Sequence, residues 1–148
     1  MDTIRAVMSQ DRFARLAGVE LLDVSPGFAR TRMAVTDEHR NGLGLVHGAA
    51  IFTLADVAFA AACNAYGTVA VAINVSISFV AAASGGALTA EARETSRNPR
   101  LGTYSVEVRD ESGDLVATFH GMAYRKKDPL PAPGGPPPPP LAQASRNF

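Results

Sequence analysis

The most apolar stretch of the chain runs from Gly48 to Tyr66, where every residue is apolar or small and neutral except Asp56. The run predicts a helix that ends at Gly67. A helix that is apolar on all sides is expected to be buried on all sides. A membrane span is disfavoured, because a central aspartate costs about 2.5–3.5 kcal/mol on insertion scales and no flanking Lys or Arg cluster fixes an orientation.

Strand-like patterns flank this helix. They cover residues 19–25 and 28–35 before it, and 69–81, 87–96, 103–110 and 115–127 after it. In the run 69–81, Val69, Val71, Ile73, Val75, Ile77 and Phe79 are predicted to share one face, with Ala72, Asn74, Ser76 and Ser78 on the other. An antiparallel sheet of five or six strands curled about the helix is the simplest enclosure, which predicts an α+β fold. An opening to solvent or to a partner chain must then remain at Asp56.

Composition narrows the class of protein. The chain has 148 residues, enough for one domain, and its 14 acidic and 14 basic residues balance, so no charge field recruits nucleic acid or an anionic membrane. The first 20 residues lack the apolar block of a signal peptide. The histidines and the one cysteine are too scattered for a metal site, and Cys63 is expected to be a small buried hydrophobe. This usage suits a reducing cytoplasm.

The composition changes after Lys127. Residues 128–148 are rich in proline and contain few core residues. We therefore expect a folded domain over residues 1–127, followed by a proline-rich, disordered tail over residues 128–148. The tail is interpreted as a solvated end, and a docking segment for a proline-binding partner is the alternative.

Two residues of the apolar helix are candidates for chemistry. Gly48 falls at the helix start, where a free backbone N–H and the positive end of the helix dipole attract a carbonyl oxygen or an oxyanion. An ordinary helix start is the alternative interpretation. Asp56 has no Lys or Arg within two turns to pair with it, and an unpaired carboxylate is costly to bury. It is either a general base or nucleophile, or a residue held by hydrogen bonds or by a subunit contact.

Helix geometry constrains how these two residues work together. Gly48 and Asp56 are eight residues apart, which corresponds to roughly 12 Å along a helix axis. They cannot both contact one reacting carbon from the same helix. Two antiparallel helices related by a two-fold axis would bring Gly48 of one chain near Asp56 of the other. The sequence thus predicts a homodimer with two equal sites at its interface.

The pattern Asn41-x5-His47-Gly48-x7-Asp56, followed by the strand AINVSISFVAA, resembles the hotdog-fold acyl-CoA thioesterases. It looks most like their PaaI-type branch, which is associated with phenylacetate degradation. The resemblance covers roughly residues 10–125. It implies a long helix wrapped by a curved antiparallel sheet, paired into dimers and usually into homotetramers.

The resemblance also implies roles for individual residues. Asp56 would be the catalytic carboxylate, as a base or a nucleophile, and Gly48 would supply the N–H that holds the oxyanion. Asn41 would help to position the thioester or water, and His47 would orient the loop beside Gly48. Some related thioesterases carry a hydroxyl where this chain has Ala72, so that the choice between base and nucleophile stays open.

The implied substrate is an aromatic (phenylacetyl- or hydroxyphenylacetyl-type) or medium-chain acyl-CoA. Coenzyme A is then part of the substrate, and no separate cofactor is expected. Arg97 and Arg100 would lie near its phosphates. The small residues Ala58, Ala61 and Ala62 either leave room for an aryl group or serve close packing.

Two other functions fit the same fold. A hotdog dehydratase or hydratase is disfavoured, because that class generally has a proline in the loop before the helix and NGLGLVHG has none. A non-catalytic acyl-CoA binding protein would use the same pocket but would not need a buried carboxylate.

Overall fold

The structure is a computed structural model that describes residues 1–136 of the chain. The elements, in chain order, are α1 (Asp2–Ser9), α2 (Arg12–Leu16), β1 (Val19–Ser25), β2 (Phe28–Ala34), the 3₁₀ turn η1 (Asp37–His39), α3 (Gly48–Asn64), β3 (Thr68–Phe79), β4 (Ala87–Arg97), β5 (Leu101–Arg109) and β6 (Leu115–Pro129). The predicted order, two strands, a long helix and then further strands, is confirmed. Strand bounds agree closely because turn residues separate the alternating runs.

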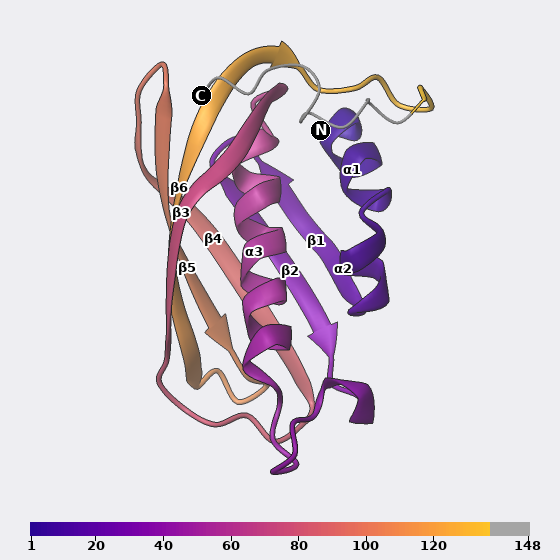
Figure 1. The fold of residues 1–148 in the computed structure, drawn as a ribbon, viewed down its shortest axis with the longest axis vertical. Coiled ribbons are helices and arrows are strands. Elements are labelled where there is room, and N and C mark those ends of the chain that lie inside the picture. Colours follow the sequence, from indigo (N-terminus) through magenta and orange to yellow (C-terminus); the bar gives the residue numbers. More distant parts are fainter. Residues whose placement is uncertain (137–148) are drawn as a thin grey trace.

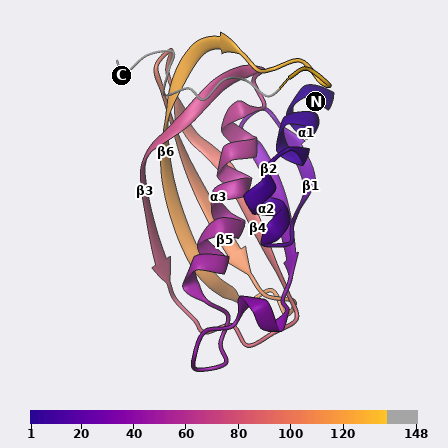
Figure 2. The same cartoon turned by 45° about the vertical axis from the view of Figure 1, so that its right-hand side comes forward.

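The six strands form one antiparallel sheet in the order β1-β2-β4-β5-β6-β3. The sheet curves around α3, which lies along its concave side, while α1 and α2 lie beside α3 near β1 (Figures 1 and 2). The predicted α+β architecture, a long helix wrapped by a curved antiparallel sheet, is confirmed.

Phe59 anchors α3 to the sheet. Its ring centroid lies 5.4 Å from that of Tyr104 in β5 and 5.7 Å from that of Phe119 in β6. Gly121 of β6 makes room for this ring, because a Cβ at position 121 would lie only 2.8 Å from Cζ of Phe59. The close approach of helix and sheet therefore depends on a residue without a side chain.

The expectation that α3 is buried on all sides is wrong for one face. The residues turned to the sheet, such as Leu54, Ala58 and Phe59, are almost fully buried. On the other face Ala49 is exposed, and Asp56 is half-buried. The sheet covers one side of the helix only, and α1 and α2 cover part of the other. The opening predicted at Asp56 is present. No helix within residues 1–136 combines the length and apolar character needed to cross a membrane.

The predicted faces of β3 are partly wrong. Ala72 pairs with Ala123 and Asn74 pairs with Met122, so that Ile73 is an extra residue in a bulge. An extra residue exchanges the two faces of a strand. From Asn74 onward the predicted alternation holds, whereas before the bulge the alanines, not the valines, share a face with Ala123. The strand lies at the edge of the sheet, and 45% of Ile73 is exposed.

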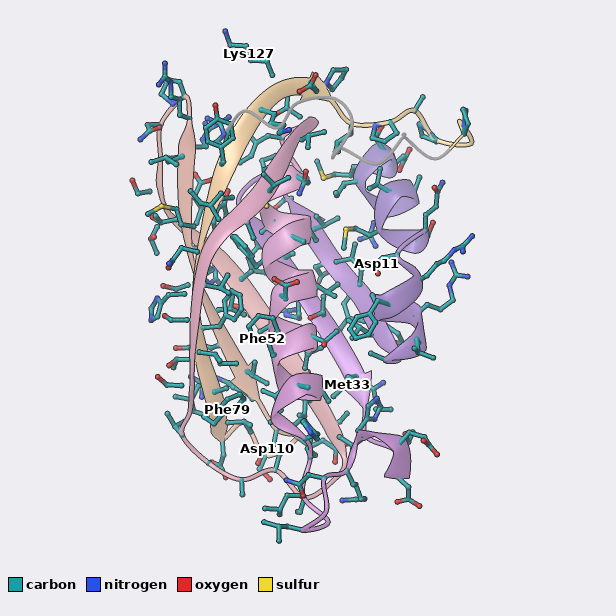
Figure 3. All side chains as sticks on the ribbon, viewed as in Figure 1. Asp11, Met33, Phe52, Phe79, Asp110 and Lys127 are labelled. Atoms are coloured by element: carbon teal, nitrogen blue, oxygen red, sulfur yellow. The ribbon has the colours of Figure 1, made fainter. Side chains whose placement is uncertain are left out.

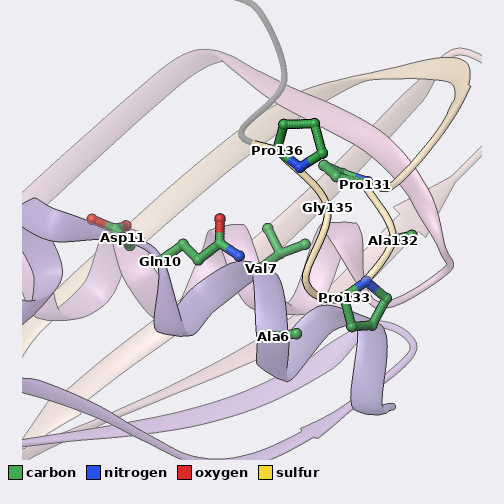
Figure 4. Close-up of a pocket in the computed structure, with 9 residues that line it drawn as sticks. All are labelled: Ala6, Val7, Gln10, Asp11, Pro131, Ala132, Pro133, Gly135 and Pro136. Atoms are coloured by element: carbon green, nitrogen blue, oxygen red, sulfur yellow. The ribbon is translucent and has the colours of Figure 1, made fainter.

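The start of the proline-rich region belongs to the folded part. Strand β6 continues to Pro129, two residues beyond the expected domain end, and the Leu130 N–H donates to the Gly67 carbonyl at 3.0 Å. Residues 131–136 then pass over α1, where they and Val7 border a cavity of about 260 Å³ (Figure 4). The remainder of the predicted tail, residues 137–148, lies outside the described residues.

Candidate active site

The start of α3 presents one free backbone donor. His47 is the N-cap residue, and its Nδ1 accepts the Ala49 N–H at 2.9 Å. The neutral imidazole then carries its proton on Nε2. The N–H of Gly48 has no acceptor among the described residues. The positive end of the helix dipole therefore coincides with an unoccupied N–H, which suits a carbonyl oxygen that becomes negatively charged.

Asn41 builds the loop that leads into this helix start. Its Oδ1 accepts the N–H groups of Leu43 and Leu45 at 2.9 and 3.1 Å, and its own N–H donates to the Leu45 carbonyl at 2.8 Å. The side-chain NH₂ has no partner within the described chain. Asn41 thus holds the loop with its oxygen and keeps two donors for a ligand.

Asp56 is half-buried on the open face of α3 and forms no hydrogen bond or ion pair with any of residues 1–136. Burial raises the pKa of its carboxyl group above the ordinary value, and the negative charge of Asp11 raises it further. Asp11 is the N-cap of α2 and lies on the α1–α2 side of α3 (Figure 3). An unpaired carboxylate of raised basicity is suited to accept a proton from water.

The predicted site residues do not converge within one chain. Asn41, His47 and Gly48 gather at the start of α3, whereas Asp56 lies two turns further along the helix. Arg97 is the last residue of β4, and Arg100 lies in the turn that leads to β5. Arg97 is near the other end of the helix, which is about 24 Å from its start. Within a single protomer, the predicted site residues therefore lie at three separate positions along the length of α3.

Arg97 belongs to a polar cluster at the end of α3. Its guanidinium lies 4.0 Å from the ring centroid of Tyr66, and its Nε lies 3.6 Å from a carboxylate oxygen of Glu94. The hydroxyls of Tyr66 and Tyr104 both donate to Glu94, at 3.2 and 2.8 Å. Burial and the Glu94 charge raise the pKa of Tyr104. The side chain of Arg100 has no hydrogen bond or ion pair in the described region.

Two cavities flank the start of α3. The Asn41 cavity, about 430 Å³, is bordered by Asn41, Gly48, Ile51, Phe79 and Val80 among others. The Phe13 cavity, about 720 Å³, is bordered by Phe13, Leu16, His39, His47, Ala49 and Thr53 among others. Both nitrogens of His39 are hydrogen-bonded within the chain, to Thr36 and to the Ala17 carbonyl, so this histidine is structural.

Several details were not visible in the sequence. Asp11 and Phe79 approach the site from distant segments, and only the capping pattern at Asp11 had a sequence signal. The three alanines Ala58, Ala61 and Ala62 are all 0% exposed, so they serve packing. Cys63 is buried as expected, and burial raises its pKa to about 12. Across residues 1–136, no three His, Cys, Asp or Glu side chains are placed to hold a metal ion.

The same elements are found in known proteins. The profile of the Thioesterase superfamily matches residues 43–117, which include Gly48 and Asp56. A putative esterase of Archaeoglobus fulgidus is 38% identical over 122 residues, which are 82% of this chain and 79% of that protein. The acyl-coenzyme A thioesterase PaaI of Escherichia coli is 36% identical over 121 residues, 81% of this chain and 86% of that protein.

Solved structures of PaaI proteins have the same fold as this chain. The E. coli PaaI protein from the phenylacetic acid degradation operon superimposes with a TM-score of 0.84 at 33% identity, over 88% of this chain and 95% of that one. A mutant of the phenylacetic acid degradation protein PaaI of Thermus thermophilus gives 0.75 at 36% identity, over 78% of this chain and all of that one (100%). The chain belongs to the thioesterase superfamily, in its PaaI-type branch with the hotdog fold. It is a thioester hydrolase.

Proposed function

We propose that the protein hydrolyses aromatic or medium-chain acyl-CoA thioesters to the free acid and coenzyme A, with phenylacetyl- and hydroxyphenylacetyl-type acyl groups as the first candidates. The observation that carries the proposal is the free Gly48 N–H at the start of the same helix that bears the unpaired Asp56. Relatives named as acyl-coenzyme A thioesterase and as phenylacetic acid degradation protein support the substrate class.

The chemistry follows from these groups. The Gly48 N–H polarises the thioester carbonyl and stabilises the oxyanion when the carbon is attacked. Asp56 accepts a proton from the attacking water, or attacks the carbon itself and forms an anhydride that water then opens. In the first route the proton passes from Asp56 to the departing sulfur as the C–S bond breaks, and the acid is released. In the second route the C–S bond breaks as the anhydride forms and coenzyme A leaves as the thiolate. The water that opens the anhydride then releases the acid, regenerates the Asp56 carboxylate and supplies the proton that the thiolate takes up. Asn41 holds the loop and directs its NH₂ group to the thioester, and His47 fixes the first turn of the helix.

The proposed active form is at least a homodimer, and a homotetramer is the expected assembly. The roughly 12 Å of helix between Gly48 and Asp56 means that each site takes Gly48 from one protomer and Asp56 from the other. Strand β3 supports such pairing, because it is an edge strand and its residue Ile73 is 45% exposed. An unpaired, partly apolar edge is a ready template for a second chain.

The coenzyme A part of the substrate would extend along the subunit surface towards Arg97 and Arg100. Arg100 has the freer side chain, while Arg97 is held against Tyr66 and Glu94. We propose that Arg100 contacts a phosphate directly and that Arg97 adds positive charge beside it. The free, buried Cys63 is compatible with the cytoplasm as the site of action.

The test is thiol release from a panel of acetyl-, hexanoyl-, octanoyl-, phenylacetyl- and hydroxyphenylacetyl-CoA. Wild-type protein should release thiol fastest from the aromatic or medium-chain members. Asp56→Asn should lower kcat by about 10²- to 10⁴-fold, the usual contribution of a proton-transferring side chain, with coenzyme A affinity within a few-fold. Asp114→Asn, in the exposed turn before β6, is the matched control. Release of no thiol by the wild type, with acyl-CoA still bound, would support the binding-protein alternative.

A further inference from the structure

Phe79 and Gly48 form a close contact between the end of β3 and the start of α3. A Cβ built on Gly48 would lie 3.1 Å from Cζ and 3.4 Å from Cε1 of the Phe79 ring. The shorter of these distances is tighter than ordinary van der Waals contact, so the ring fills the space in which a side chain at position 48 would stand. The residue at position 48 is therefore small because Phe79 is present, as well as because a substrate approaches.

Phe79 is also open to a ligand. Its side chain is 52% exposed, which is unusual for a phenylalanine at the inner side of a sheet. Within residues 1–136 it stacks on no other aromatic ring and faces no cation. In the view of Figure 3 it lies near the lower end of the sheet, away from Asp11. One flank of the ring contacts Gly48, and the rest borders the Asn41 cavity.

The Asn41 cavity has the chemistry of an acyl site. Of the side chains that border it in the described chain, only that of Asn41 is polar, and the others are aliphatic or belong to Phe79. The oxygen of Asn41 is already used by the loop, so that the unused polar groups are its NH₂ and the Gly48 N–H. Donors at an otherwise apolar cavity suit a carbonyl oxygen attached to an apolar group, whereas no Lys or Arg side chain among the described residues borders the cavity to pair with a phosphate dianion.

The geometry points to Phe79 as a specificity-determining residue. We propose that its ring is the wall on which the apolar acyl group packs while the thioester carbonyl meets the Gly48 N–H, and that the Asn41 cavity receives the acyl group. The coenzyme A moiety then leaves the site in the other direction. This inference rests on the proposed thioesterase function, because it assigns the subsite that the acyl group occupies.

A double-mutant cycle tests the contact. Gly48→Ala should lower the midpoint of thermal unfolding and reduce kcat, because its new methyl group collides with the ring. Phe79→Leu removes the rigid ring edge, so the double variant Gly48→Ala/Phe79→Leu should regain at least half of the midpoint loss caused by Gly48→Ala. The thermal part of the cycle needs no substrate. Additive midpoint shifts would overturn the proposed contact, even for a protein without activity.

The panel of acyl-CoA substrates tests whether the Phe79 ring contacts the acyl group. Phe79→Leu should reduce kcat/KM for phenylacetyl-CoA at least tenfold relative to its effect on acetyl-CoA, and Phe79→Tyr should restore the aromatic preference. Free coenzyme A should inhibit all three proteins equally, because the proposed wall faces the acyl group only. Equal losses for every acyl group would overturn the subsite. A monomeric Phe79→Leu protein in light scattering would likewise overturn it, in favour of a purely structural role at the dimer edge.

The two proposals fail in different ways. If the wild type releases thiol but the selectivity of Phe79→Leu is unchanged, the subsite is wrong and the thioesterase function stands. If the wild type releases no thiol from any member of the panel, the proposed function is wrong. The subsite can then still be judged by binding. Phenylacetyl-CoA should bind to the wild type more tightly than to Phe79→Leu, and equal affinity would overturn it.

Discussion

Asp11, at the start of α2, places a second carboxylate beside Asp56 of α3. Burial does most to raise the pKa of Asp56, and the charge of Asp11 raises it further. A base must be deprotonated to act, so kcat/KM should rise with pH through the raised pKa of Asp56. The acidic limb of the pH profile therefore reports on this pair of residues.

Asp11→Asn should shift that acidic limb to lower pH. The substitution removes the negative charge and thereby lowers the pKa of Asp56, while its side-chain oxygen can still accept the Ala14 N–H that caps α2 at 2.8 Å. The measurement is kcat/KM for an acyl-CoA substrate between pH 4 and 8. Asp114→Asn serves as the control and should leave the limb in place. A limb that does not move, or that moves to higher pH, would contradict the assignment of Asp56 as the titrating group.

Asp56→Asn should make the folded protein more stable at neutral pH while it lowers kcat. Because folding raises the pKa of Asp56, its protonation contributes to the free energy of unfolding, and this contribution is fully present below the ordinary carboxyl pKa of about 3.9. The contribution is lost as the pH rises through the raised pKa of the folded state. The gain of the variant in thermal midpoint should thus be largest near pH 7 and shrink towards pH 4. A variant less stable than the wild type at pH 7 would show that the carboxylate has a stabilising partner.

Gly48→Pro should distinguish the catalytic effect of the Gly48 N–H from the effect of the small size of glycine. Proline is well tolerated at the first helical position, and His47 has the extended φ and ψ of −63° and 137° that suit a residue before proline. In the Phe79→Leu background, the proline variant should have about 10²- to 10³-fold lower kcat than the alanine variant, which keeps the N–H. Equal kcat values would remove the Gly48 N–H from the oxyanion role.

Gly121→Ala should destabilise the fold without touching the site. Its Cβ would lie 2.8 Å from Cζ of Phe59, a ring held between Tyr104 and Phe119. Overpacking of this kind costs about 1–3 kcal/mol of unfolding free energy. Denaturant unfolding measures it, and Gly42→Ala is the control because a Cβ there meets no atom within 4 Å. Equal stability of the two variants would show that the helix can move away from the sheet.

The fold was predictable because its patterns are local. Alternating runs and turn glycines delimit the strands, and one long apolar run predicts a helix that is most simply covered by a curved sheet. The bulge at Ile73 was not predictable, because alternating valines and isoleucines read the same on either side of it. The open face of α3 was also missed in part, since sequence hydrophobicity does not say which side a sheet, a short helix or a partner covers.

The site was predictable as far as it depends on neighbours along the chain. A lone carboxylate in an apolar helix marks Asp56, and the loop-to-helix transition marks Gly48. The approach of Asp11 and of Phe79 depends on tertiary packing between segments far apart in the sequence. The restraint of Arg97 by Glu94 and Tyr66 is likewise a tertiary feature, which gives Arg97 and Arg100 different degrees of freedom.

The central claim is that each site combines Gly48 of one protomer with Asp56 of the other. Two differently tagged Phe79→Leu chains, one with Gly48→Pro and one with Asp56→Asn, should each have little activity alone, whereas their purified heterodimer retains one intact site and about half of the activity of Phe79→Leu. A heterodimer of Phe79→Leu with the chain that carries Phe79→Leu, Gly48→Pro and Asp56→Asn should have little activity, since each of its sites lacks one group. The reverse result, an inactive first heterodimer and a half-active second one, would contradict the account.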